Sequence, residues 1–251
     1  MLPTPSTSHV DYDRVYEPAE DSYLLLDTLS SSDESSFLSA HFSTAPSPLI
    51  CEVGTGSGVV LAFVAAQSSS ILGRSDVLSL GVDLNTFACK ATSQTVRTAL
   101  LESQSTSTFL AATNADLTSS LRDGAVDILI FNPPYVPAPL PDATLRFDDA
   151  ALSSQQAFER DSHLLALSYA GGEAGMEVTQ RLLDEVPRVL SGRGVAYVLL
   201  CAQNRPDQVM QAIRGWSGGG GGCWAADIVG RSGKQAGWEK LVVLRIWRPV
   251  S

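Results

Sequence analysis

The chain has 251 residues, of which 44% are apolar and 18% are charged, and its net charge at pH 7 is −10. This length supports one full-sized hydrophobic core, the composition excludes bulk disorder, and no apolar run reaches the roughly 20 residues of a membrane-spanning helix. The acidic balance disfavours a protein that mainly binds nucleic acid, although residues 181–251 carry a net charge of +5, which leaves a local basic face open.

The beginning of the chain is predicted to contain one helix between two irregular segments. Residues 1–14 are interpreted as a flexible tail. Residues 15–29, VYEPAEDSYLLLDTL, predict a helix, because Pro18 suits a first turn and acidic side chains are favourable near a helix N-terminus. Residues 30–48 contain eight serines and two prolines, a composition that predicts a mobile loop.

Strands and helices then alternate along the rest of the chain. The predicted strands span residues 49–53, 77–82, 108–112, 126–131, 195–200, a stretch near 228, and 241–247. The predicted helices span residues 59–66, 86–101, 175–190 and 205–215. This alternation predicts a single α/β domain over residues 15–251, with a mostly parallel sheet that helices cover on both faces. The last two strands follow each other without a helix, so we expect an antiparallel last strand.

Residues 136–170 form a long connection that is rich in proline and aspartate. They follow the carboxyl end of the strand at 126–131, and ligand-facing loops lie at that end of the strands in open α/β sheets. We interpret this connection as a candidate substrate lid.

A glycine-rich turn and a carboxylate mark a candidate cofactor site. The turn EVGTGSG at residues 52–58 joins a strand to a helix, and its glycines permit a ligand to approach the backbone closely. Such turns also occur in nicotinamide and flavin binders, or serve only as tight turns. Asp83 ends the next strand, where its carboxylate can accept both hydroxyls of a ribose; its alternative role is to cap the helix at 86–101.

The sequence Asn132-Pro133-Pro134-Tyr135 points to the class of reaction. The prolines fix the backbone and remove two donors, which leaves the side-chain oxygen of Asn132 and the carbonyl of Pro133 as acceptors for an NH₂ group. Tyr135 provides a flat wall for a planar amide or base. Acceptors on both N–H bonds aim the nitrogen lone pair at a methyl donor, so this is catalysis by positioning, and the three histidines are not expected to take part.

Together with VYEPAEDSYLLLDTL, EVGTGSGVV, GVDLN, NADL, FNPPYV and YAGGEAGMEV, these residues resemble the class I S-adenosylmethionine-dependent methyltransferases. Within them, the chain is similar to the HemK-like glutamine methyltransferases. This resemblance implies a Rossmann-like, seven-stranded fold. It also implies N5-methylation of the glutamine in the GGQ motif of the eukaryotic class-1 translation release factor, with S-adenosylmethionine as cofactor.

The resemblance also implies roles for particular residues. Cofactor contacts are expected from Ser22, Glu52, Gly54, Gly56, Asp83, Asp116, Leu117 and Asn132. Among them, Asp83 is expected to hold the ribose and Asp116 the adenine amino group, with Leu117 beside it. The catalytic clamp on the substrate is expected from Asn132, Pro133 and Tyr135. Three segments depart from the family pattern: residues 30–48 and 217–222 resemble insertions far from the chemistry, and residues 138–165 form a longer segment beside the substrate.

A partner subunit is a further expectation. The resemblance implies that the chain works as a heterodimer with a small zinc-binding activator. The strand at 108–112 is expected at an edge of the sheet, and it is apolar without a lysine or proline to protect it. We therefore expect the activator to cover this edge by strand addition, whereas the loop at 102–107 is the alternative cover.

Alternatives in substrate and function stay open at this stage. Another amino group, in the adenine of DNA or RNA or in a protein lysine such as one of a histone, can replace glutamine. The acidic charge opposes DNA, and a lysine ammonium does not match an acceptor ring until it is deprotonated. A non-catalytic scaffold is disfavoured because Glu52, Asp83, Asp116 and Asn132 are all present.

The four cysteines are expected to be unpaired. Cys51, Cys89, Cys201 and Cys223 show no Cys-x-x-Cys spacing, so the sequence suggests neither a disulfide framework nor a metal site. The N-terminus has no basic segment followed by an apolar one, as a secretion signal would. We expect a reducing compartment, the cytoplasm, with the nucleus as a second location.

Overall fold

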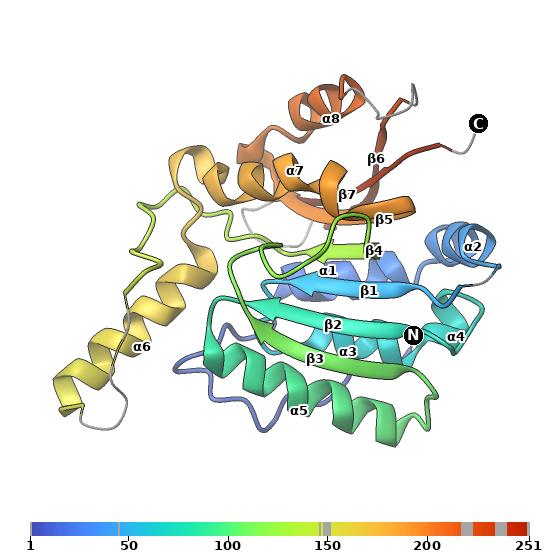
Figure 1. The fold of residues 1–251 in the computed structure, drawn as a ribbon. Coiled ribbons are helices and arrows are strands. Elements are labelled where there is room, and N and C mark those ends of the chain that lie inside the picture. Colours follow the sequence, from blue (N-terminus) through green and yellow to red (C-terminus); the bar gives the residue numbers. More distant parts are fainter. Residues whose placement is uncertain are drawn as a thin grey trace.

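The computed structural model describes residues 2–44, 46–145, 147, 152–216, 223–233 and 240–249. Its centre is one sheet in the order β3-β2-β1-β4-β5-β7-β6 (Figure 1). The strands are β1 (Leu49–Val53), β2 (Leu78–Asp83), β3 (Thr108–Asn114), β4 (Val126–Phe131), β5 (Leu190–Cys201), β6 (Ala225–Arg231) and β7 (Leu241–Trp247). Strand β7 is antiparallel to β5 and β6, and the other neighbouring pairs are parallel. The predicted α/β architecture with an antiparallel last strand is confirmed.

Helices cover both faces of this sheet. They are α1 (Glu20–Leu29), α2 (Ser32–His41), α3 (Val59–Ala66), α4 (Ser68–Ile71), α5 (Thr86–Glu102), α6 (Ser154–Tyr169), α7 (Glu177–Val189) and α8 (Pro206–Arg214), with short 3₁₀ turns η1 (Glu173–Gly175) and η2 (Ala202–Asn204). In β4, Ile128 and Ile130 join the core under α1 and α3, whereas Leu129 and Phe131 join the core under α7. Alternate side chains of a strand point to opposite faces, and the part of β4 that is buried on both faces, Ile128–Phe131, is apolar at every position.

The prediction of a mobile loop at residues 30–48 is wrong over α2. Ser31 caps this helix by accepting a hydrogen bond from the backbone N–H of Glu34. The buried carboxylate of Glu34 accepts from the hydroxyl of Tyr197 at 2.7 Å, and Leu38 and Phe42 are fully buried in the core. This serine-rich segment thus forms a helix because the side chains at every fourth position make one face that packs on the sheet.

The N-terminal segment expected as a flexible tail lies along α5. Within residues 1–14, Val10 is buried, and together with Val15 it packs against Ala88 and Ala91. Helix α1 begins only at Glu20, so the helix predicted for residues 15–29 is shorter than expected. The flexibility of the tail stays a prediction.

The connection at residues 136–170, predicted as a lid, contains a helix that the sequence interpretation did not include. Helix α6 begins with a capping box, in which Ser153 and Gln156 exchange side-chain and backbone hydrogen bonds. Figure 1 shows α6 on the side toward which the arrowheads of β1 and β2 point. The segment therefore lies where ligands bind in this class of fold.

Two further sequence expectations have clear outcomes. All four cysteines are free, and three of them are buried. Strand β3 is an edge of the sheet, as predicted, and it extends to Asn114. The segment 217–222, interpreted above as an insertion, lies outside the described residues. Over the part of the chain that is described, no helix is both long and apolar enough to cross a bilayer.

Candidate active site

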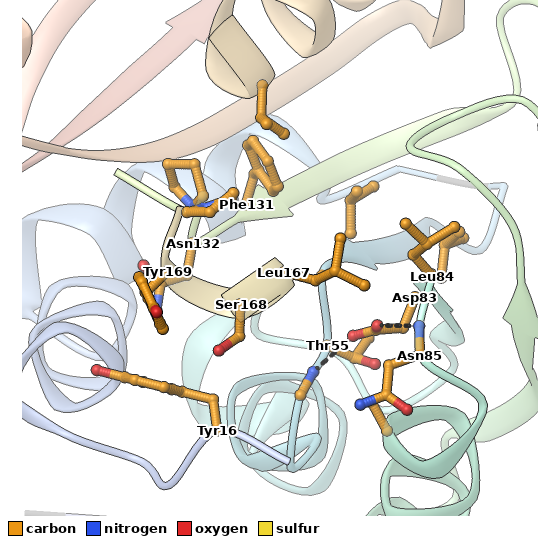
Figure 2. Close-up of a pocket in the computed structure, with 18 of the residues that line it drawn as sticks. Tyr16, Thr55, Asp83, Leu84, Asn85, Phe131, Asn132, Leu167, Ser168 and Tyr169 are labelled. Carbon is orange, nitrogen blue, oxygen red and sulfur yellow. Dashed lines mark hydrogen bonds between the residues drawn. The ribbon is translucent and has the colours of Figure 1, made fainter. Parts of the chain in front are cut away.

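A pocket opens at the carboxyl ends of β1, β2 and β4, where the chain turns from one half of the sheet to the other (Figure 2). Every residue predicted for the site lines it: Ser22, Glu52, Gly54, Gly56, Asp83, Asp116, Leu117, Asn132, Pro133 and Tyr135. Leu167 and Ser168 of α6 also line the pocket (Figure 2). The segments far apart in sequence are therefore brought together as expected.

The glycine turn after β1 has a backbone that only glycine adopts easily. Gly54, Gly56 and Gly58 have φ values of +66°, +50° and +78°. A Cβ at Gly58 would meet Cα of Thr92 in α5 at 2.6 Å, so this glycine also permits close packing of the two helices. The turn needs its glycines both for its shape and for its contact with α5.

Glu52 connects β1 to the helix that follows the turn. Its Oε2 accepts a hydrogen bond from the backbone N–H of Leu61 in the first turn of α3 at 2.9 Å. The side chain is buried, and this burial, with the nearby charge of Asp83, raises the pKa of Glu52 well above its usual value despite that hydrogen bond.

Asp83 holds the glycine turn from the neighbouring strand. Its Oδ2 accepts from the N–H of Gly56 at 2.9 Å, and its Oδ1 accepts from the N–H of Asn85 at 2.8 Å (Figure 2). Burial raises the pKa of Asp83. The cap of α5 is Asn85, which accepts from the N–H of Phe87 at 2.9 Å, so capping is not the role of Asp83.

Asp116 and Leu117 follow strand β3, which ends at Asn114, and they lie at the pocket. Asp116 accepts a hydrogen bond from Nη2 of Arg181 in α7 at 2.6 Å, and both side chains are about half exposed. Leu117 is nearly buried and has a φ of +46°, a strained conformation for a residue with a Cβ. Both residues line the pocket.

Asn132 directly follows β4 and faces α1. Its Nδ2 donates to Oδ2 of the buried Asp21 at 3.0 Å. Its Oδ1 is buried and accepts no hydrogen bond from any residue that the structure describes. Buried polar atoms are nearly always paired, so an unpaired acceptor in a pocket is suited to a donor that a ligand brings.

The Asn132–Tyr135 turn is held by the segment that follows α6. The N–H of Gly171 donates to the carbonyl of Val136 at 2.8 Å, and the N–H of Gly172 donates to that of Ala138 at 3.0 Å. A Cβ at Gly171 would overlap the carbonyl of Pro134, and one at Gly175 would overlap that of Tyr135. Glycines are thus required where the segment after α6 is in direct backbone contact with the Asn132–Tyr135 turn.

Replacing Gly175 with alanine is expected to displace Tyr135 and to impair the site. The residue has a φ of +68°, and its added Cβ has no room, so we expect a loss of at least ~2 kcal/mol in the free energy of unfolding. Denaturant unfolding measures this loss. Gly192→Ala is the matched control, because nothing lies within 4 Å of its added Cβ, and equal stability of the two variants would contradict the packing described.

Sequence interpretation did not identify Asp21 as a site residue. It was considered only as an acidic residue near a helix N-terminus, yet it lies four and eight residues before Leu25 and Leu29, on the buried face of α1. A carboxylate on an apolar helix face was the available signal. The contributions of Tyr16 and Tyr169 to the pocket were also not predicted.

Curated relatives share nearly the full length of the chain. It is 34% identical to "Methyltransferase HEMK2" of Mus musculus over 97% of this chain and 96% of that protein. It is 31% identical to "eRF1 methyltransferase catalytic subunit mtq2" of Schizosaccharomyces pombe over 99% and 96%. A Methanocaldococcus jannaschii protein named as a protein N5-glutamine methyltransferase is 25% identical over 93% and 92%. No family model matches the chain.

The fold also occurs in solved structures. A protein of Listeria monocytogenes described as a class I S-adenosylmethionine-dependent methyltransferase superposes with a TM-score of 0.52 at 14% identity, over 94% of this chain and 64% of that one. This likeness concerns the fold alone. It confirms the predicted class I methyltransferase architecture.

Proposed function

This chain belongs to the HemK-like methyltransferases that include HEMK2 and mtq2, and we propose that it methylates N5 of the glutamine in the GGQ motif of the class-1 translation release factor. The observation that carries this proposal is the buried Oδ1 of Asn132, which has no hydrogen-bond partner among the residues that the structure describes. An acceptor of this kind suits the NH₂ group of a carboxamide. The same substrate is supported by the names of two relatives: that of the S. pombe protein contains eRF1, and that of the M. jannaschii protein contains glutamine.

We propose S-adenosylmethionine as the methyl donor. The pocket fits it because the buried Glu52 and the partly buried Asp83 place two carboxyl groups, both with raised pKa values, where a cation would stabilise their ionised forms. Asp83 would hold the ribose hydroxyls, and Asp116 and Leu117 would contact the adenine. Ser22 and the glycine turn would contact the rest of the cofactor. When bound, the cofactor supplies an electrophilic methyl group on a sulfonium.

The chain's own contribution to the reaction is to position an amide nitrogen. The lone pair of an amide nitrogen is delocalised, so it is a poor nucleophile. Acceptors at Oδ1 of Asn132 and the carbonyl of Pro133 would hold both N–H bonds, and Tyr135 would bound the planar group. Among the described residues, no histidine lines the pocket.

A methyl-transfer assay with labelled cofactor tests the substrate. The recombinant substrates are the class-1 release factor, its variant with arginine in place of the GGQ glutamine, a histone and duplex DNA. Label on the unmodified release factor alone supports the proposal. Label on DNA or the histone, or equal label on the arginine variant, would assign another amino group to the same site.

We propose a partner subunit that pairs with β3. The S. pombe relative is named as a catalytic subunit, which supports the presence of a second subunit. Among the described strands, β3 pairs only with β2, and its other edge is unpaired. Leu110 in β3 and Leu101 at the end of α5 are 49% and 79% exposed. An apolar, unprotected edge is suited to strand addition. That the partner is a small zinc-binding activator is part of this proposal.

Replacing Leu110 with lysine is expected to weaken binding of the activator at least ~10-fold, because the charge enters an apolar strand edge. Phe158→Lys on α6 is the control, since it also replaces an exposed apolar residue but lies away from β3. Co-purification and calorimetry measure the effect. A wild-type chain that is soluble, monomeric and fully active on its own would contradict the partner proposal.

A further inference from the structure

Asp21 is a buried carboxylate at the wall of the pocket that none of the roles above explains. Its side chain is 4% exposed, and it lies in the first turn of α1. Its Oδ1 accepts from the N–H of Ser22 at 2.6 Å and from the hydroxyl of Ser22 at 3.3 Å. Its Oδ2 accepts from Nδ2 of Asn132 at 3.0 Å. The carboxylate is therefore fixed by its own helix and directed at Asn132.

This contact determines which way the amide of Asn132 faces. The oxygen and nitrogen of a carboxamide are on opposite sides of its carbon, and either orientation fits the same space. An ionised carboxylate can only accept, so it binds the NH₂ side of Asn132 and leaves Oδ1 on the other side. That is the oxygen which is buried without a partner among the described residues.

We propose that Asp21 is a positioning residue that holds the Asn132 amide with its oxygen available to the substrate NH₂ group. A hydrogen bond from Nδ2 to a carboxylate also polarises the amide and makes Oδ1 a stronger acceptor. The inference rests on the proposed function, because it assigns the orientation that an amide substrate requires. Asp21 does not itself touch the reacting atoms.

Asp21→Asn tests this role with the least change in shape. The new side chain keeps an oxygen for the N–H of Ser22, but its NH₂ can donate to Oδ1 of Asn132 and turn that amide around. A donor then replaces the acceptor in the pocket. We expect kcat for the release factor to fall at least ~100-fold, as when a preorganised polar group is removed from an active site.

Three other measurements separate positioning from a structural effect. The Kd for S-adenosylmethionine, KM for the release factor and the melting temperature are expected to stay close to the wild-type values. Glu20→Gln is the matched control, because it removes a neighbouring carboxylate that is exposed, and its kcat is expected to be unchanged. A kcat of Asp21→Asn within ~3-fold of wild type would overturn the proposal.

The side-chain amide signals of Asn132 in NMR spectra give a readout that does not depend on the substrate. They are identified by their absence from Asn132→Ala. In the wild-type chain, one amide proton is expected to show the low-field shift of a bond to a carboxylate, and this shift is expected to be lost in Asp21→Asn. Identical signals in both proteins would overturn the proposal. A wild-type enzyme inactive on the release factor, with the shift present, would instead reject only the proposed substrate.

Discussion

Asn132→Ala is expected to lower kcat for methyl transfer at least ~10³-fold, the largest effect of any single change in the site. The variant removes Oδ1, the buried acceptor that has no partner among the described residues, and leaves the substrate nitrogen without its anchor. It also leaves Asp21 without the N–H group that it binds. Steady-state kinetics with the release factor measure the loss.

Binding and folding serve as the controls for this variant. Because Asn132 acts mainly on the reacting nitrogen, the Kd for S-adenosylmethionine is expected to change less than ~10-fold, about the contribution of one hydrogen bond. The melting temperature is expected to stay within a few degrees of the wild-type value. Turnover near the wild-type rate would contradict the assigned mechanism.

Asp83→Ala is expected to weaken cofactor binding by roughly 10–100-fold, the scale of charge-assisted hydrogen bonds. The variant also frees the N–H groups of Gly56 and Asn85, which Asp83 holds in place. Asp207→Ala is the matched control, because it removes an exposed carboxylate in α8. Calorimetry gives both values, and an unchanged Kd would leave Asp83 with a structural role only.

The same titration reports on the protonation of the pocket. Burial raises the pKa of Asp83 in the free protein, and a bound cation would lower it again. Binding therefore releases protons, and affinity is expected to rise as the pH increases through the pKa of the free protein. Calorimetry in buffers of different ionisation enthalpy measures this release. It is expected to be smaller in Asp83→Ala, although Glu52 still contributes.

The framework of the fold was predictable because its signals are local. Strand β4 is apolar except at Asp127 and β7 except at Arg245, and both match their predicted ranges. The serine-rich segment was misinterpreted because composition was weighed above spacing. Glu34, Leu38 and Phe42 recur at every fourth residue, which is the helical period that α2 uses to pack on the sheet.

The site was predictable where one motif supplies both the residue and its chemistry. Asn132 and Asp83 lie at strand ends, and the parallel sheet necessarily brings those ends together. The contact between Asp21 and Asn132 joins residues 111 positions apart. Local patterns contain no information about such a pair, so the orientation of the Asn132 amide became apparent only in the folded chain.

Mass spectrometry of the release factor after reaction with a deuterated methyl donor tests the central claim most directly. The wild-type enzyme, prepared with its activator, is expected to place one labelled methyl group on the side-chain nitrogen of the GGQ glutamine. Asn132→Ala is expected to place none. A methyl group on a lysine or a backbone site, or a labelled glutamine with Asn132→Ala, would contradict the account of a site built to hold a carboxamide NH₂.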